Sequence, residues 1–437
     1  MLAPLAVATA LVAVPALVGA TPDPTASQQS SAQTRGVDDD VAINQIQTIG
    51  SHNSYHLLPS EKEAEIRRSF IGAGDQLMTY QHAPLPTQFA SQKVRQIELD
   101  IFLDPSGGKY ADPLLRSVAG DGPMDPIMNT PGIKVLHVQD VDYRSSCLTL
   151  VQCLEQVKGW SDANSSHVPI AILLELKDEE VPFDGFSFEI PDPWTASGMD
   201  TLDDEIRSVF GPDQVITPDD VRGSHATLEE AVLSDGWPTL GDSRGKVMFL
   251  MDNGGGYRSD YLAGHPSLQG RMLFTNASPG NADAAFVKEN DATKEARIRS
   301  LVEAGYVVRT RADGDTREAR TNDTTLRDAA LRSGAQWVST DYPMPGMAVG
   351  FTTSYSAQIP GGTVARCNPV NGPATCVSAE LDTIFTPIDP PVAPTTITLP
   401  DETRPNPPAG TPPATGPGGV GQAPGATPVA TRPAYTG

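Results

Sequence analysis

Residues 94–102 read Val-Arg-Gln-Ile-Glu-Leu-Asp-Ile-Phe, an apolar run in which two carboxylates stand two positions apart. Successive side chains of a strand point to opposite faces, so Glu98 and Asp100 would share one face. Leu99 lies between them and Ile97 and Ile101 flank them, which favours a buried strand over an exposed edge. The run therefore predicts a core strand that ends in acidic side chains able to meet one ion.

Seven similar runs occur along the chain, separated by longer helix-like or loop stretches such as Thr293–Ala304 and Thr324–Ser333. The other predicted strands are Ile43–Ile49, Ile133–Val138, Pro169–Leu176, Lys246–Met251, Arg271–Thr275, Tyr306–Thr310 and Gln336–Thr340. Eight strands alternating with helices indicate an α/β fold of the TIM-type (β/α)8 barrel class. An open doubly wound sheet would give a similar string, but no glycine-rich phosphate fingerprint follows the first run.

Polar residues recur where these runs end. They are His52, Asn53, Glu98, Asp100, His137, Glu175, Lys177, Asp252, Asn253, Arg309, Arg311 and Asp341. A loop cap or a surface charge would explain any one of them. In a barrel, however, the carboxyl ends of all strands meet at one rim, where loops build the active site. The recurrence therefore predicts a site at that rim.

The residue types favour metal-assisted acid–base chemistry. Asn53, Glu98, Asp100 and Glu175 offer only hard oxygen ligands, which suit Ca²⁺, with Mg²⁺ as the second choice. His52 and His137 suit general acid–base work near neutral pH. A structural role is the expectation for the remaining histidines, which are His56, His82, His167, His225 and His265.

Three basic residues at predicted strand ends would serve an anionic phosphodiester. They are Lys177, Arg309 and Arg311, and an arginine can donate to two oxygens at once. The alternative is that they form ion pairs with the acidic residues of the same site. The formal net charge of −23 over 437 residues argues against a nucleic-acid partner and would repel an anionic lipid surface.

The two ends of the chain differ in composition from its middle. Residues 1–20 form an apolar run ending Val18-Gly19-Ala20, typical of a secretory signal peptide, although no basic residue precedes Arg35. Residues 21–40 are expected to be a flexible segment, 41–384 the barrel, and 385–437 a disordered tail rich in Pro, Thr, Ala and Gly. The tail would suit cell-wall association of a secreted protein.

Four cysteines fall into two local pairs, Cys147 with Cys153 and Cys367 with Cys376. In an exported protein this pattern predicts two short-loop disulfides. A zinc site is the alternative, but the paired C-x-x-C or H-x-x-x-H spacing is missing.

Several motifs together resemble the Ca²⁺-dependent phosphoinositide-specific phospholipase C family of bacteria and fungi. The opening one is Gln45-Ile-Gln-Thr-Ile-Gly-Ser-His-Asn-Ser-Tyr-His56, with Ser51 where the family usually has threonine. The others are residues 94–100, Leu136-His-Val-Gln-Asp-Val-Asp-Tyr-Arg-Ser-Ser-Cys147, Ile172-Leu-Leu-Glu-Leu-Lys177, Val308-Arg-Thr-Arg-Ala-Asp313 and Ser339-Thr-Asp-Tyr-Pro343. The similarity runs from about residue 41 to 345.

The resemblance implies a TIM-type barrel with Ca²⁺ at its mouth. Asn53, Glu98, Asp100 and Glu175 match the family's metal ligands, and His52 and His137 match its catalytic histidines. The implied reaction is attack by the inositol 2-hydroxyl on the phosphodiester of a phosphatidylinositol-type lipid. It gives diacylglycerol and a cyclic inositol phosphate. A monomer acting at a membrane or lipid-aggregate surface is expected.

Three other functions compete with this interpretation. A glycerophosphodiester phosphodiesterase or a sphingomyelinase D-like enzyme would share the barrel, the histidines and the acidic site, but the H-N-S-Y-H opening fits phospholipase C better. A non-catalytic wall-associated binding protein would have lost catalytic residues that are present here. A Ser-His-Asp hydrolase would need a G-x-S-x-G elbow, which the chain lacks.

Overall fold

The computed structural model describes residues 36–182, 187–234, 236–348, 350–351 and 353–387. The predicted signal peptide 1–20 lies outside the described residues, as do positions 21–35 of the next segment and nearly all of the tail. Val37–Asp40, for which a flexible segment was expected, form the short helix α1, and Asp38 is ion-paired with Arg244 at 2.6 Å.

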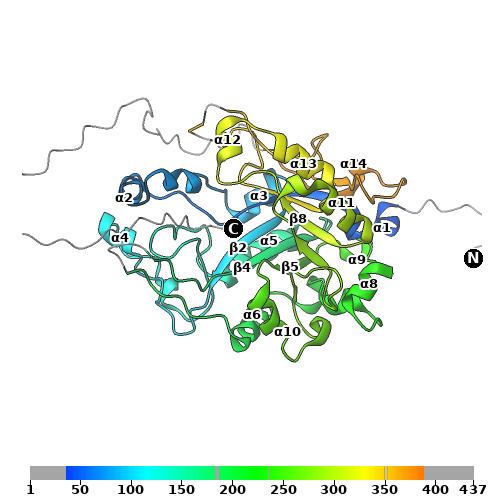
Figure 1. Ribbon diagram of the computed structural model, residues 1–437, viewed down its shortest axis with the longest axis horizontal. Coiled ribbons are helices and arrows are strands. Elements are labelled where there is room, and N and C mark those ends of the chain that lie inside the picture. Colours follow the sequence, from blue (N-terminus) through cyan, green and yellow to red (C-terminus); the bar gives the residue numbers. More distant parts are fainter. Residues whose placement is uncertain (1–35, 183–186, 235, 349, 352, 388–437) are drawn as a thin grey trace, which may run out of the picture. The chain divides into compact units, whose positions relative to one another are not determined.

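Eight parallel strands form a nearly closed barrel, which confirms the predicted fold class (Figure 1). They are β1 (Ile46–Ser51), β2 (Val94–Phe102), β4 (Ile170–Leu176), β5 (Val247–Met251), β6 (Leu273–Phe274), β7 (Phe286–Lys288), β8 (Val307–Arg311) and β9 (Trp337–Thr340). Their order is β6-β5-β4-β2-β1-β9-β8-β7. A single parallel bridge between Asn276 and Phe286 joins the two end strands.

One predicted barrel strand is wrong. Of Ile133–Val138 only Lys134–Val135 form a strand, β3, and it pairs antiparallel with the end of β2. A parallel strand needs a crossover that carries the chain back past the whole sheet. Between β2 and β3 the helices are only the short α4 (Leu114–Ala119) and η3 (Pro126–Asn129), which do not carry the chain back to the start of β2. The chain therefore turns round at the end of β2 and pairs antiparallel with it. The eighth barrel position belongs to β7, whose three residues are too few to show a strand pattern in the sequence.

Helices surround the strands, as Figure 1 shows. The α-helices are α2 (Glu61–Ile71), α3 (Leu85–Ser91), α4 (Leu114–Ala119), α5 (Leu150–Ala163), α6 (Ala196–Val209), α7 (Pro218–Arg222), α8 (Leu228–Ser234), α9 (Leu240–Ser243), α10 (Gly255–Leu262), α11 (Glu295–Ala304), α12 (Arg317–Thr321), α13 (Thr325–Ser333) and α14 (Ser378–Leu381). The 3-10 helices are η1 (Ile43–Gln45), η2 (Gly72–Met78), η3 (Pro126–Asn129), η4 (Pro212–Gln214), η5 (Pro266–Leu268) and η6 (Ala292–Lys294).

Local sequence explains where the longer helices begin. Ser60 caps α2 by accepting a hydrogen bond from the Glu63 N–H, and the Glu63 carboxylate accepts one from the Ser60 N–H. Thr149 caps α5 because its Oγ1 accepts a hydrogen bond from the Gln152 N–H at 3.2 Å. Helix α5 then buries Leu150, Leu154 and Val157 at helical spacing against the barrel.

Strand β2 shows why the barrel mouth is polar. Ile97, Leu99 and Ile101 have no exposed surface and belong to the apolar layer beneath the helices. The alternate residues Gln96, Glu98 and Asp100 are also fully buried. A Cβ on Gly50 of β1 would lie 1.8 Å from the Gln96 Oε1, so only glycine leaves room for Gln96 at this crossing.

The segment after β9 is part of the fold. Strand β10 (Ala365–Cys367) pairs antiparallel with β1, and Asp382 accepts hydrogen bonds from the buried Arg95 Nε at 2.7 Å and the Val168 N–H at 3.1 Å. Both predicted disulfides, Cys147–Cys153 and Cys367–Cys376, are present. In the part of the chain that is described, helices long and apolar enough to cross a bilayer are absent.

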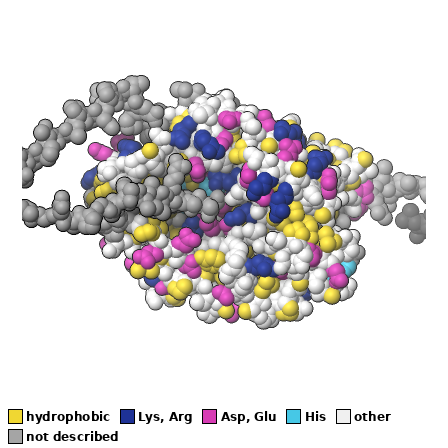
Figure 2. Space-filling view, viewed as in Figure 1, with side chains coloured by type: hydrophobic (Ala, Val, Ile, Leu, Met, Phe, Trp, Pro, Cys, Tyr) yellow, Lys and Arg dark blue, Asp and Glu magenta, His cyan; other side chains and the backbone are white. Residues whose placement is uncertain are grey.

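Basic and acidic side chains alternate over the face shown in Figure 2. Several charged side chains of the described residues are ion-paired across elements, for example Lys109 with Asp192 at 2.6 Å and Arg271 with Asp200 at 2.7 Å. Opposite charges of different elements are thus paired with each other at these places.

Candidate active site

Three carboxylates meet at the carboxyl ends of two adjacent strands. Asp100 of β2 lies directly opposite Glu175 of β4 in the parallel register, and Glu98 is one pleat earlier on the same face as Asp100. Each offers one oxygen, and these oxygens all lie within 4.8 Å of one another. Glu98 and Asp100 have no exposed surface and Glu175 has 7%.

Several buried oxygens in this cluster lack a hydrogen-bond partner among the described residues. They are the Asn53 Oδ1, the Glu98 Oε1 and both side-chain oxygens of Asp100. The Asn53 Nδ2 donates to the Tyr80 hydroxyl at 2.9 Å, so its Oδ1 is the atom left over. Unpaired buried oxygens are costly, and a hard cation would satisfy them. The residues present therefore fit a calcium ion.

The loop that carries Asn53 is tied to β2 through its backbone. The Ser54 N–H donates to the Glu98 carbonyl at 2.9 Å, and the Ser54 Oγ accepts from the Glu98 N–H at 2.9 Å. Asn53 itself has a φ of 42°, a left-handed conformation that asparagine tolerates better than most residues. The amide is thus held next to the strand that carries Glu98.

The carboxylates repel one another in a buried setting. Burial raises the pKa of Glu98 to about 7, with Asp252 and Glu175 adding to the rise and Arg309 opposing it. Burial, together with the charge of Glu175, also raises the pKa of Asp100 well above its usual range. Protons of such a cluster are released to solvent when a cation binds, because the cation offsets the repulsion between the ionised carboxylates.

The three predicted substrate-binding residues all pair with carboxylates. The Lys177 Nζ lies 3.1 Å from Glu175 and 3.6 Å from Asp100. Arg309 is ion-paired with Glu98 and also donates to Asn290 and, at 3.1 Å, to the Ser339 Oγ. Arg311 Nη2 lies 3.6 Å from Asp341. Side-chain exposure is 24% for Lys177, 7% for Arg311 and 0% for Arg309, so Lys177 is the most accessible to a substrate.

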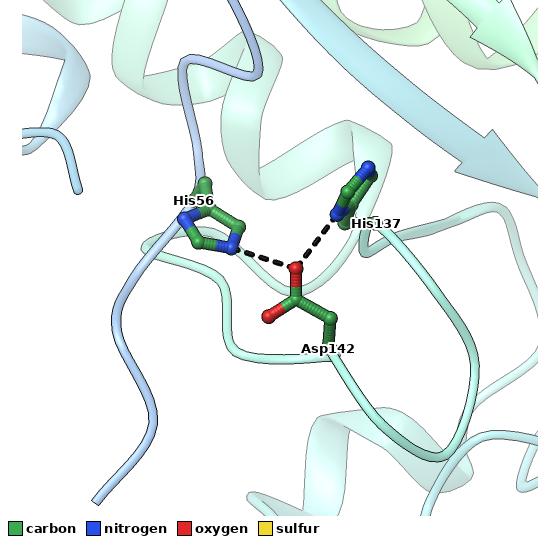
Figure 3. A group of neighbouring side chains, drawn as sticks. All are labelled: His56, His137 and Asp142. Carbon is green, nitrogen blue, oxygen red and sulfur yellow. Dashed lines mark hydrogen bonds and ion pairs between the residues drawn. The ribbon is translucent and has the colours of Figure 1, made fainter. Parts of the chain in front are cut away.

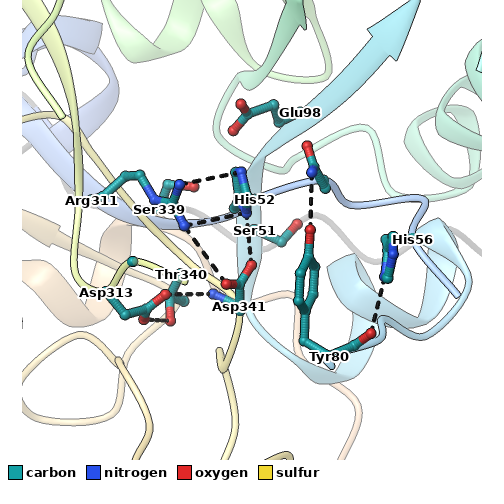
Figure 4. Close-up of polar contacts among 12 residues, drawn as sticks. Ser51, His52, His56, Tyr80, Glu98, Arg311, Asp313, Ser339, Thr340 and Asp341 are labelled. Carbon is teal, nitrogen blue, oxygen red and sulfur yellow. Dashed lines mark hydrogen bonds and ion pairs between the residues drawn. The ribbon is translucent and has the colours of Figure 1, made fainter. Parts of the chain in front are cut away.

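His52 forms one histidine–aspartate pair (Figure 4). Its N–H donates to the Thr340 carbonyl of β9, and its Nδ1 lies 2.8 Å from the Asp341 Oδ1. Two guanidinium nitrogens of Arg311 each lie 3.3 Å from a ring nitrogen. Burial, and then the charge of Arg311, lowers the pKa of His52 well below its usual value. A neutral His52 can accept a proton.

His137 forms a second pair with a carboxylate, shown in Figure 3. Its Nδ1 lies 2.7 Å from the Asp142 Oδ2, which also lies 2.9 Å from the His56 Nε2. Burial lowers the pKa of His137, while the hydrogen bond to Asp142 opposes this shift. Burial would raise the pKa of Asp142, but the charges of His56 and Arg67 hold it well below its usual range. Asp142 is therefore a carboxylate.

Tyr80 lies between the two histidine groups. Its ring stacks on His56 with centroids 4.4 Å apart and lies 5.9 Å from the ring of His52. Its carbonyl faces the His56 Nδ1 at 3.0 Å, and its hydroxyl holds Asn53. Tyr80, which follows η2, thus bonds to the predicted metal ligand Asn53, stacks on His56 and lies near His52.

The sequence analysis brought most of this site together and missed several of its partners. It named Asp341 only as one of the residues at the rim, and it gave no role to Asp142, Tyr80 or Arg67. Asp142 and Asp341 both stand inside quoted motifs. His56 was expected to be structural, and it is in fact bonded to the carboxylate that also holds His137. His137 follows β3 and not a barrel strand, so it reaches the rim on a loop.

Comparison with known proteins decides the family. Residues 41–369 match the model of the family described as "Phosphoinositide phospholipase C, Ca2+-dependent". The chain belongs to this family. Like its other members, this Ca²⁺-dependent phosphoinositide phospholipase C is a phosphodiesterase.

Solved structures of calcium-dependent phospholipases C from bacteria are similar to this chain. One is the calcium-dependent phosphoinositol-specific phospholipase C of Pseudomonas sp in its apo form, at 17% identity and a TM-score of 0.45, covering 76% of this chain and 97% of that chain. Another, from Streptomyces antibioticus, has 18% identity and a TM-score of 0.43, and covers 69% and 95%. None of the curated proteins matches this chain significantly.

Proposed function

We propose that this phospholipase C is exported and cleaves phosphatidylinositol-type lipids to diacylglycerol and a cyclic inositol phosphate. The observation that carries the proposal is the group of unpaired buried oxygens on Asn53, Glu98 and Asp100, placed in one mouth with two histidine–aspartate pairs. An acid, a base and a cation site are the parts that an intramolecular phosphodiester cleavage needs.

Each side chain receives a role from its surroundings. His52, kept neutral by burial and Arg311, takes the proton of the inositol 2-hydroxyl as its oxygen bonds to phosphorus. His137 gives a proton to the diacylglycerol oxygen as the bond from phosphorus to that oxygen breaks. One proton is taken up and one is released, so the step balances.

The cation site adds charge stabilisation to this scheme. Asn53, Glu98, Asp100 and Glu175 would hold the ion. When bound, Ca²⁺ would lower the pKa of the 2-hydroxyl and offset charge that develops on the phosphoryl oxygens. Lys177, Arg309 and Arg311 would add positive charge for the same anionic group.

Export is supported by two observations. Both cysteine pairs form disulfides, and disulfides persist in oxidising compartments outside the cytosol. The apolar run at 1–20 has the composition of a signal peptide. We propose the tail from 385 onward as a spacer between the barrel and a cell wall, and the barrel as a monomer.

The deciding experiment is phosphatidylinositol turnover by the full chain, with Ca²⁺ and then with a chelator, followed by phosphorus NMR. We expect a Ca²⁺-dependent cyclic inositol phosphate, lost in His52→Ala and His137→Ala. His265→Ala is the matched control, because among the described residues its ring bonds to the Gln269 carbonyl, within its own turn and away from the site. Cleavage of glycerophosphodiesters or choline lipids instead would support the glycerophosphodiesterase or sphingomyelinase D alternative. No turnover of any diester would support a binding protein.

A further inference from the structure

Arg67 is a buried cation that the catalytic scheme does not use. It lies on α2, inside the matched residues 41–369 but outside the motifs quoted for the resemblance, and only 1% of it is exposed. Its Nη1 donates to the Asp142 Oδ1 at 2.6 Å and its Nε donates to the Asp75 Oδ1 at 2.6 Å. A guanidinium buried this deeply needs carboxylate partners, and Asp142 and Asp75 supply them.

The two oxygens of Asp142 are divided between different partners. Its Oδ1 accepts a hydrogen bond from Arg67. Its Oδ2 lies within hydrogen-bond distance of the Nδ1 of His137 and the Nε2 of His56, as Figure 3 shows. Because Arg67 holds one oxygen, the plane of the carboxylate is set, and its other oxygen points to His137. With the hydrogen on Nδ1 directed at Asp142, the Nε2 of His137 is the nitrogen left to face a substrate.

His137 needs such an anchor because of where the chain places it. Strand β3 ends at Val135, so His137 stands on a loop and not on a rigid barrel strand. That loop closes on itself through backbone bonds, with the His137 N–H donating to the Asp142 carbonyl at 3.2 Å and the Asp142 N–H donating to the Val138 carbonyl at 2.9 Å. These bonds set the backbone but leave the imidazole ring free to turn.

We propose that Arg67 is a positioning residue for the proton donor His137 and that it acts through Asp142. The proposal rests on the proposed function, in which His137 protonates the leaving oxygen. Helix α2 thereby becomes part of the machinery for leaving-group departure. The side that activates the nucleophile, with His52, Asp341 and Arg311, has its own carboxylate and does not depend on Arg67.

This division has a consequence that a structural role would not produce. A diacylglycerol alkoxide leaves poorly unless it is protonated, whereas 4-nitrophenolate leaves well without a proton. Loss of proton donation should therefore slow cleavage of phosphatidylinositol and spare cleavage of 4-nitrophenyl myo-inositol phosphate. Damage to the calcium site or to the fold should slow both.

The test measures kcat on both substrates at saturating Ca²⁺ for the full chain and for Arg67→Met, Arg67→Lys and Arg144→Met. Arg144 is the matched control, because it also joins α2 to this region, through Glu63 at 2.5 Å, and has no bond to Asp142. We expect Arg67→Met to lower kcat on phosphatidylinositol about 10- to 100-fold and on the nitrophenyl substrate by less than about threefold. Arg67→Lys should fall between, and Arg144→Met should keep the wild-type ratio of the two rates.

Equal losses on both substrates, or no loss on either, would overturn the proposal. If Arg67→Met unfolds below the assay temperature, the ratio of kcat on phosphatidylinositol to kcat on the nitrophenyl substrate is measured for Arg67→Lys instead, and it tests the proposal in the same way. Failure of the wild-type chain to cleave either substrate would instead overturn the proposed function. Nitrogen NMR of the histidine rings still tests positioning in that case, since Arg67→Met should shift the Nδ1 signal of His137 and an unchanged signal would contradict the role.

Discussion

The affinity for Ca²⁺ should fall steeply as pH is lowered from 8 to 6. A bound cation requires ionised ligands, and the pKa of Glu98 is raised to about 7 by burial and by its acidic neighbours. A group with that pKa is about 90% ionised at pH 8 and about 10% ionised at pH 6. Since affinity follows the ionised fraction, Glu98 alone should weaken binding about tenfold, or about 1.4 kcal/mol, over this range.

Asp100 should add to this effect. Its pKa is raised well above the usual range by burial and Glu175, so protonation of Asp100 also competes with the ion as pH falls. The direction is fixed by the sign of the shifts: a raised carboxyl pKa in the free protein means that protons compete with Ca²⁺ more strongly as pH falls. We therefore expect a total change of at least about tenfold.

Isothermal titration calorimetry of the full chain at pH 6, 7 and 8 measures this change directly. Repeating it in two buffers of different ionisation enthalpy counts the protons released, and we expect about one or more at pH 6. Glu98→Gln should flatten the pH dependence. Glu205→Gln is the matched control, because burial also raises the pKa of Glu205 but its carboxylate bonds to the Ile133 N–H outside the site. A dissociation constant that stays within twofold from pH 6 to pH 8 would refute the reasoning.

Two further predictions follow from other parts of the fold. Asp382→Ala should destabilise the protein by about 3–5 kcal/mol in urea unfolding, because it leaves the fully buried Arg95 without its counter-ion; a loss below 1 kcal/mol would mean that the segment after β10 is dispensable. The pH optimum of turnover at saturating Ca²⁺ should lie on the acid side of 6.5. Burial lowers the pKa of both histidines, so His52 stays neutral into the acid range while protonated His137 is lost as pH rises through its lowered pKa. A rate that rises between pH 6.5 and 8 would contradict the acid role of His137.

The sequence predicted those parts of the site that depend on local pattern. The E-x-D spacing in residues 94–102 gave a buried strand with both carboxylates on one face, and β2 spans these residues. Neighbouring parallel strands then brought Glu175 opposite Asp100 without further information. Two general rules were enough to predict that these carboxylates meet: side chains two apart on a strand share a face, and parallel strands of a barrel end at one rim.

The site residues that the sequence did not predict form contacts between distant parts of the chain. Arg67 and Asp142 are 75 positions apart, and His56 and Asp142 are 86 apart, so their bonds depend on how two loops fold over the rim. No local pattern marks an arginine on an ordinary capped helix as a partner of a distant loop. Strand β7 was missed for another reason, since three residues carry too little periodicity to be recognised.

Site residues on strands and site residues on loops are held in place in different ways. The carboxylates and Arg309 stand on β2, β4 and β8, where neighbouring strands hold the backbone on both sides. His137 stands on a loop, and it is the histidine with the larger set of buried partners behind its carboxylate: His56, Arg67 and, through Arg67, Asp75. Proton donation requires an angle and a distance to one oxygen, so a loop residue can perform it only if its ring is held from behind. The extra buried charge on α2 therefore agrees with the proposal that His137, which stands on a loop, is the proton donor.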